Sequence, residues 1–461
     1  MKLDEALTQV IEEFDHVHPD GQVDVNKLDE GVLPTFVTAE SGHQLHYTKR
    51  SLEALLHISH ILYRASNSLP KILGENDYYA MVRQAIADCY ASGDFAPKVG
   101  GVPNGKACLK KRLTEAVAAL TTEFTHSFPA WTMNVEAQRK FAIGPVVFLT
   151  RDKWLDSVHF SRKALQYFAK RPGKRDTDWK RRVRELLAGK ARPSKPWPLA
   201  DWVYRAIKDA PSVLKVKVTG SERALSRQRA RYAARTALDC LALLFQDAEH
   251  HAQFVLGDDR VVPVSGSTLM ESKGHLWIPG SGLKLRGWTG AEADAIAAVA
   301  SPKEKKLLKS AGAVIRTLLD PLRSKHPQLI QRWATALAVA SEGCRETHDG
   351  LALAKLASSL DILSGGGMEK GIRAMLLHQT GRKANDVMVK GPAPMTFKEV
   401  VNRIYSHGRS QFLHGNHVDL MMPFDEERRY ATFLARSALR TSLARLPHYA
   451  GPDDPKAFQT M

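Results

Sequence analysis

Apolar residues recur every three or four positions through most of the chain, which is the spacing of helices that bury one face. This pattern predicts helices over residues 51–66 and 110–124 in the N-terminal part. A run of β-branched and aromatic residues over 142–150 predicts a strand. From 254 to 288, short apolar pieces alternate with turns rich in glycine, aspartate and serine, so a small β-rich section is expected there.

The helical pattern continues through the C-terminal part. It predicts segments over 303–322, 328–344, 349–364, 368–380, 396–414 and 425–446. Gly365–Gly367 ends the third of these helices, acidic residues open the last one, and Pro447 follows it, as helix boundaries favour. About 160 residues of this kind are enough for a helical bundle that folds as a unit.

Two further helices are expected in the centre of the chain, over 178–188 and 223–245. The predicted fold class is therefore α+β and predominantly α-helical. Three parts are expected: an α-rich N-terminal region over 1–160, a basic helical segment followed by the small β-rich section over 161–300, and the helical bundle over 301–461.

Composition excludes several protein classes. The chain has 461 residues, of which 44% are hydrophobic and 25% charged, as in ordinary folded proteins. Its longest clean apolar run, 142–149, is far shorter than the roughly 20 residues of a membrane helix. No membrane contact and a cytoplasmic location without a signal peptide are therefore expected. The four cysteines are scattered, and no histidine pair has a companion at zinc spacing, so neither metal nor cofactor is expected.

The positive charge is concentrated in one stretch. The formal net charge is +17, and residues 162–235 contain 22 basic and 6 acidic residues. Such a field attracts polyanions, above all nucleic acid. The alternatives are a solvated surface that aids solubility, and basic residues that pair with acids elsewhere in the fold.

Two groups of cations in this stretch are candidates for RNA binding. The first shares one helix face at four-residue spacing and consists of Arg227, Arg231 and Arg235. The second consists of Lys180, Arg181 and Arg182. A DNA-binding protein that uses the first group is a weaker alternative.

The segment 403–415 carries the residues best suited to chemistry, with Arg409 and His414 five positions apart. On an α-helical wheel they lie about 140° apart on the face opposite an apolar stripe. That stripe comprises Phe397, Val400, Val401, Ile404 and Phe412. Leu413 lies between Arg409 and His414, together with Ser410, and an apolar residue on a cationic face suggests that a partner covers it. A two-fold partner would bring two such pairs into one cleft.

Arginine and histidine together suit RNA cleavage. A neutral imidazole can take the proton of a 2′-hydroxyl, and an imidazolium can protonate the departing 5′-oxygen. A guanidinium can hold the phosphate and its developing charge through paired donors. DNA lacks the internal nucleophile and would be spared. In the alternative interpretation, Arg409 pairs with an acid and His414 only caps the helix before Gly415.

The run RSQFLHG at 409–415 resembles the RSxxxHG signature of HEPN ribonuclease domains, most closely the ApeA-like group. Two preceding segments are also similar to that family, an acidic residue within an apolar helix over 356–363 and an Arg-bearing helix over 372–377. The resemblance covers roughly residues 325–450. It implies a homodimer with a composite, metal-independent ribonuclease site, with Arg409 and His414 as catalytic residues and Ser410 and Asp361 in support. The chain departs from the family in two places: Asp361 replaces the usual glutamate, and Tyr405 lies four residues before Arg409, where three is commoner.

The resemblance also implies a biological class. Proteins with such a C-terminal domain are often antiviral abortive-infection or toxin-type effectors, whose N-terminal part senses a phage-derived trigger or holds substrate. We therefore expect an endonuclease that cleaves tRNA or mRNA, with residues 1–160 as a possible sensor. The alternative is a non-catalytic RNA- or partner-binding dimer that uses the HEPN-like bundle as a scaffold.

Overall fold

The structure is a computed structural model of the chain. It describes residues 1–29, 35–95, 105–120, 122–137, 140–169, 178–194, 199–245, 248–259, 265–268, 271–276, 280–283, 291–321, 324–415 and 423–461. The described part is predominantly helical with one small sheet, which confirms the coarse fold class. It divides into two compact units, one formed by residues 1–124 with 218–228 and the other by 125–217 with 229–461. The three-part division expected from the sequence stays a prediction.

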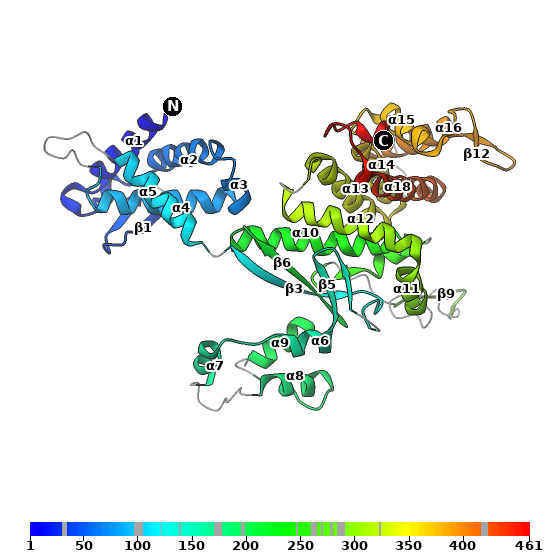
Figure 1. The fold of residues 1–461 in the computed structure, drawn as a ribbon, viewed down its shortest axis with the longest axis horizontal. Coiled ribbons are helices and arrows are strands. Elements are labelled where there is room, and N and C mark those ends of the chain that lie inside the picture. Colours follow the sequence, from blue (N-terminus) through cyan, green and yellow to red (C-terminus); the bar gives the residue numbers. More distant parts are fainter. Residues whose placement is uncertain are drawn as a thin grey trace. The chain divides into compact units, whose positions relative to one another are not determined.

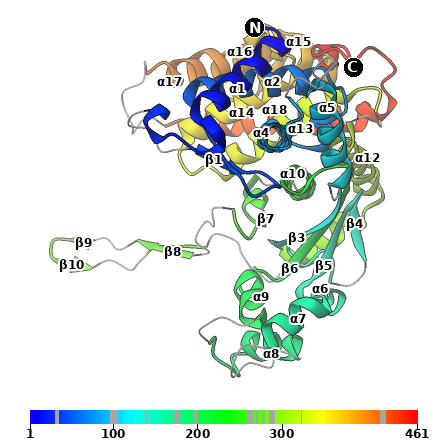
Figure 2. The ribbon, with the colours of Figure 1, turned by 90° about the vertical axis from the view of Figure 1, so that its left-hand side faces the viewer.

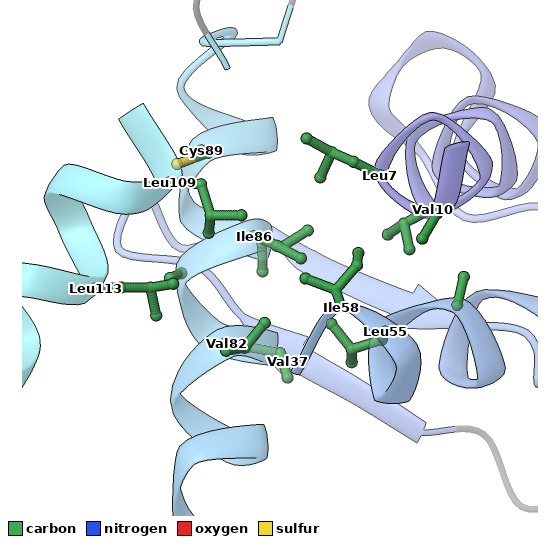
Figure 3. Packing of buried hydrophobic residues seen from close by; sticks show 14 of the residues in the cluster. Leu7, Val10, Val37, Leu55, Ile58, Val82, Ile86, Cys89, Leu109 and Leu113 are labelled. Carbon is green, nitrogen blue, oxygen red and sulfur yellow. The ribbon is translucent and has the colours of Figure 1, made fainter. Parts of the chain in front are cut away.

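The first unit is a helical domain with a short hairpin. Its elements are α1 (Leu3–Val17), β1 (Thr35–Thr38), β2 (Gln44–Tyr47), α2 (Lys49–Arg64), α3 (Leu69–Ile72), α4 (Glu75–Ala91) and α5 (Gly105–Ala119). Figure 3 shows side chains from α1, α2, α4 and α5 meeting in one apolar core. Helix α1 contributes Leu7, Val10 and Phe14, whose three- and four-residue spacing places them on one buried face.

The second unit contains a five-stranded sheet. Its strands are β3 (Glu123–Trp131), β4 (Phe141–Ile143), β5 (Val146–Thr150), β6 (Ser212–Thr219) and β7 (Val255–Leu256), in the order β4-β5-β6-β3-β7 (Figure 2). The single strand predicted over 142–150 is wrong, because Gly144 and Pro145 turn the chain into a hairpin and Gly144 adopts φ +57°. The helix predicted over 110–124 ends earlier, because the alternating residues of 123–131 form β3.

Four short helices lie between β5 and β6 in the chain: α6 (Arg151–Ser157), α7 (Arg162–Ala169), α8 (Trp179–Leu187) and α9 (Leu199–Ile207). They share a small core that includes Leu155, Trp179 and Val183. After β6 comes α10 (Arg223–Ala242), the long helix expected from the sequence. The predicted β-rich section contains the short strands β8 (Ser265–Thr268), β9 (Glu271–Ser272), β10 (His275–Leu276) and β11 (Gly280–Leu283), in which the antiparallel pair β9–β10 lies in the chain between the paired strands β8 and β11.

The C-terminal helices of the second unit form a bundle (Figure 1). They are α11 (Ala291–Ala300), α12 (Pro302–Leu319), α13 (Pro327–Arg345), α14 (Asp349–Leu363), α15 (Met368–Thr380), α16 (Phe397–Asn402), α17 (Gln411–Leu413) and α18 (Asp425–Arg445). A hairpin of β12 (Val387–Val389) and β13 (Met395–Thr396) precedes α16. Helix α14 packs between α13 and α18, and the fully buried Trp333 of α13 donates a hydrogen bond from Nε1 to the carbonyl of Leu439 at 3.0 Å.

Helix boundaries in this bundle follow the sequence signals closely. Gly365, Gly366 and Gly367 all have positive φ and end α14, as predicted. No helix in the described ranges is both long and apolar enough to cross a membrane.

Candidate active site

The predicted helix over 396–414 is continuous but not uniform. Thr396 and Glu399 form a capping box that starts α16. Residues Arg403–Ser410 then form a π-helix, and α17 follows. A π-helix has i→i+5 hydrogen bonds and is rare outside functional sites. The α-helical wheel drawn from the sequence is therefore wrong over this segment, because the wider turn changes the angle between successive side chains.

The π-helix is held against α14 at close range. Gly408 lies against Leu353, and a Cβ atom at Gly408 would come within 2.5 Å of Cδ2 of that leucine. Ile404 and Tyr405 are buried on the same side. Phe412 contacts the rings of His348 and Phe424, with centroid distances of 5.7 and 5.9 Å. This packing fixes the orientation of the polar residues that follow.

Arg409 is bound by two hydroxyl groups. Its Nε donates a hydrogen bond to Oγ of Ser358 at 3.0 Å, and its Nη1 donates to the hydroxyl of Tyr405 at 2.6 Å. The guanidinium carbon lies 4.9 Å from the centroid of the Tyr405 ring. Neither Tyr405 nor Ser358 was expected from the sequence to hold Arg409.

Asp361 joins the same group through Tyr405. The tyrosine hydroxyl binds Arg409 and is close enough to the Asp361 carboxyl group to feel its charge. Burial, and then the Asp361 charge, raise the pKa of Tyr405 above its usual range, although Arg409 acts in the opposite direction. Oδ1 of Asp361 also accepts a hydrogen bond from the backbone N–H of Met368 at 3.0 Å, at the start of α15. The structure thus brings together Asp361 and Arg409, two of the predicted site residues.

Arg409 differs from the arginines around it. Arg403 lies 2.9 Å from Glu426 and 2.6 Å from Glu427, and Arg373 lies 2.5 Å from Glu369. Within the ranges that the structure describes, Arg409 has no carboxylate in ion-pair distance. Hydroxyl partners orient a guanidinium without neutralising it, so Arg409 keeps a full positive charge for an anionic ligand.

His414 and Leu413 are exposed at the end of the same helical segment. The backbone N–H of His414 donates to the carbonyl of Ser410 at 3.0 Å, and its side chain forms no hydrogen bond with any described residue. Ser410 is half-buried. The Leu413 side chain is 55% exposed, as expected for an apolar residue that a partner would cover. The imidazole of His414 is therefore accessible to a ligand, beside an uncovered apolar side chain.

Most of the cations predicted to bind RNA have partners inside the fold. Arg231 pairs with Asp258 and lies 3.1 Å from Asp259, and Arg235 lies 2.5 Å from Asp259 and pairs with Glu342. Arg227 is exposed and has no ion pair among the described residues. The alternative of internal pairing with acids therefore accounts for Arg231 and Arg235.

The second predicted group is also engaged. Lys180 donates to the carbonyl of Asp156 at 2.8 Å, and Arg181 lies between Asp178 and Glu185 at 2.8 and 2.5 Å. Arg182 donates to the carbonyl of Arg192 at 2.7 Å. Arg181 is exposed, and its ion pairs are of the weak kind that water and salt screen.

One group of potential metal ligands was missed by sequence spacing. Cys89, Asp94 and Cys108 offer ligand atoms within 4.8 Å of one another in the first unit. The Sγ of Cys89 donates to that of Cys108 at 3.5 Å, and Cys108 donates to Asp94 at 3.1 Å. Burial raises the pKa of Cys89 to about 12, so this thiol stays protonated without a metal. Sequence spacing gave no signal, because helix packing brings the two cysteines together.

No family model matches the chain, and neither the curated proteins nor the solved structures contain a match to it. The resemblance to HEPN ribonuclease domains therefore rests on the motif residues alone and stays a prediction.

Proposed function

We propose that this protein is a metal-independent RNA endonuclease that cleaves tRNA or mRNA as an antiviral, abortive-infection or toxin-type effector. The proposal rests on the surroundings of Arg409. It is oriented by Tyr405 and Ser358, and none of the described carboxylates neutralises it. An exposed imidazole, His414, ends the same helical segment.

The chemistry follows from these two side chains. Neutral His414 accepts the proton of the 2′-hydroxyl, whose oxygen attacks the adjacent phosphorus. Arg409 binds the phosphate oxygens and the charge that develops on them. The P–O bond to the 5′-oxygen breaks, and the protonated His414 of a second copy supplies a proton to that oxygen. The products are a 2′,3′-cyclic phosphate and a 5′-hydroxyl.

A homodimer completes the site in this mechanism. The reaction needs one base and one acid, and each copy offers one exposed His414. Leu413, exposed beside it, provides apolar area for a contact between the two copies. A two-fold axis near Leu413 would place both histidines in one cleft.

Incubation of purified protein with total tRNA in EDTA tests the proposal, beside Arg409→Ala and His414→Ala. We expect cyclic-phosphate fragments from the parent protein and at least a hundredfold less from either variant, as for the loss of one transition-state donor. His407→Ala is the matched control, because His407 is exposed on the same helix. Equal cleavage by all proteins would overturn the site assignment.

The rival proposal is a non-catalytic RNA- or partner-binding dimer, which the exposed Leu413 also supports. It predicts salt-sensitive RNA binding and no cleavage, even in lysate from phage-infected cells. Cleavage that appears only in infected lysate would instead support an effector with a phage-derived trigger.

A further inference from the structure

A basic groove lies between α12 and α18 in the C-terminal bundle. Its volume is about 940 Å³, and α12 forms one wall while the C-terminal half of α18 forms the other. Figure 1 shows these two helices within the bundle.

The cations of this groove form a stripe on α12. Lys303, Lys306 and Lys309 follow at three-residue spacing, and Arg316 continues the stripe two turns later. All four side chains are exposed, and none is within ion-pair distance of a carboxylate in the described ranges. They therefore form a positive field that the fold does not neutralise.

The groove contains one carboxylate, which is already engaged. Glu304 lies 2.7 Å from Nη2 of Arg440, on the opposite wall. This ion pair connects α12 to α18. Among the described residues that line the groove, Glu304 is the one acid, and it is paired with Arg440 and not with a lysine of the stripe. By contrast, Arg231 and Arg235 of the basic stretch are bound by internal acids. A cluster of unpaired cations therefore lies here, outside the stretch with the largest sequence excess.

We propose that this groove binds the phosphate backbone of the RNA substrate. The choice of RNA over DNA rests on the proposed function. From Lys303 to Arg316 the stripe extends about 20 Å along the helix axis, enough for several consecutive phosphates. Ala313 and Ala444 add an apolar lining that can contact sugars and bases between them.

Helix α18 connects the groove to the active site. Near its N-terminus, Glu426 and Glu427 hold Arg403 of the π-helix. Near its C-terminus, Arg440 faces the stripe on α12. The two ends of α18 thus contact the π-helix that carries Arg409 and the wall of the groove, so both belong to one bundle.

The test is RNA binding by the full-length His414→Ala protein in EDTA. The substitution prevents cleavage of the RNA during the measurement. The triple variant Lys303→Glu, Lys306→Glu and Lys309→Glu is compared with its parent by anisotropy of a labelled single-stranded RNA. Each lost phosphate contact lowers the slope of log affinity against log salt by about 0.7, so a decrease of about 2 is expected with an affinity loss of tenfold or more. The charge-neutral triple variant to glutamine should show the same slope change and guards against misfolding of the glutamate variant.

Lys305→Glu is the matched control, because Lys305 is exposed on the same helix but does not line the groove. An unchanged slope in both triple variants, or an equal loss in the control, would overturn the groove assignment. Equal or tighter binding of duplex DNA would overturn the choice of RNA. Binding that depends on the groove in a protein that never cleaves RNA would refute the nuclease and leave the groove in place.

Discussion

The hydroxyl of Tyr405 accepts a 2.6 Å hydrogen bond from Arg409, one turn further along the same π-helix. Burial and the charge of Asp361 on α14, which acts on the same hydroxyl, raise the pKa of Tyr405. Arg409 forms no ion pair with Asp361 among the described residues, and its hydrogen bonds go to the hydroxyls of Tyr405 and Ser358. This arrangement defines Tyr405 as a positioning residue.

Replacement of Tyr405 by phenylalanine should lower kcat about tenfold with little change in KM, because Arg409 keeps its charge and Ser358 but loses its second anchor. The free energy of unfolding should fall by about 1 kcal/mol, the net value of one hydrogen bond. Tyr430→Phe is the control, since Tyr430 donates to Glu426 away from Arg409. Steady-state kinetics on a defined RNA and urea unfolding provide the two readouts. A rise in KM alone would contradict a positioning role.

Charge reversal at two arginines of α10 should change the stability of the protein by very different amounts. Arg235→Glu would leave the mostly buried Asp259 with Arg231 as its remaining partner and place a like charge beside it, so the free energy of unfolding should fall by about 3 kcal/mol. Arg227→Glu should change it by less than about 0.5 kcal/mol, because Arg227 is exposed. Denaturant unfolding of both variants measures the difference. Equal stability would show that the Arg235 pair contributes nothing to the fold.

The unfolding free energy should fall as the pH drops below about 6.5. Burial and the neighbouring Arg345 and Arg436 hold the pKa of His251 well below its usual range, so this residue is neutral in the folded protein. Below the unfolded pKa of about 6.5, the histidine is protonated in the unfolded chain but not in the native state. The free energy of unfolding therefore falls by about 1.4 kcal/mol per pH unit. His251→Leu should flatten this dependence, as measured by urea unfolding across the range. The pKa of His18 is also lowered by burial and accounts for part of the remaining slope.

Three of the four cysteines should react slowly with thiol reagents in the native protein at about pH 8. Burial raises the pKa of Cys89 to about 12 and that of Cys344 to about 11, and it raises that of Cys240 well above the usual value. Labelling of these thiols should be at least about a hundredfold slower than in guanidinium chloride, because the thiolate is the reactive form. Mass spectrometry of partially labelled protein identifies the sites. Fast native labelling of Cys240 would contradict its burial.

Local signals predicted the C-terminal helices well. Helix α15 spans Met368–Thr380 as expected, because Gly367 and Gly381 flank it in left-handed conformations. Arg409, chosen from its type and spacing, and Asp361, implied by the family resemblance, both lie near Tyr405. The contributions of Ser358 and Tyr405 had no signal at the sequence level, since a hydroxyl becomes a ligand only through packing and the π-turn.

The partners of the basic residues could not be predicted for a different reason. Arg235 pairs with Glu342, which lies more than a hundred positions away in the chain. A count of charges over one stretch of sequence gives no information about such distant partners. The lysine stripe of α12 is short, with five basic residues and one acid over 303–316, so it contributes little to the total charge of the chain. The proposal for this stripe depends on the ion pair between the neighbouring Glu304 and Arg440, which only the structure shows.

The π-helix makes the length of residues 403–410 as important as their identity. One additional residue is accommodated per turn, so the chain beyond Ser410 leaves the bundle at an angle that the local residue count determines. Deletion or insertion of one residue here would rotate Leu413 and His414 by about 100° about the helix axis. The proposed dimer contact and the proposed base would then turn together, away from Arg409, while every individual side chain remained present. Homologous chains that use this surface in the same way are therefore constrained in spacing, even where their side chains vary.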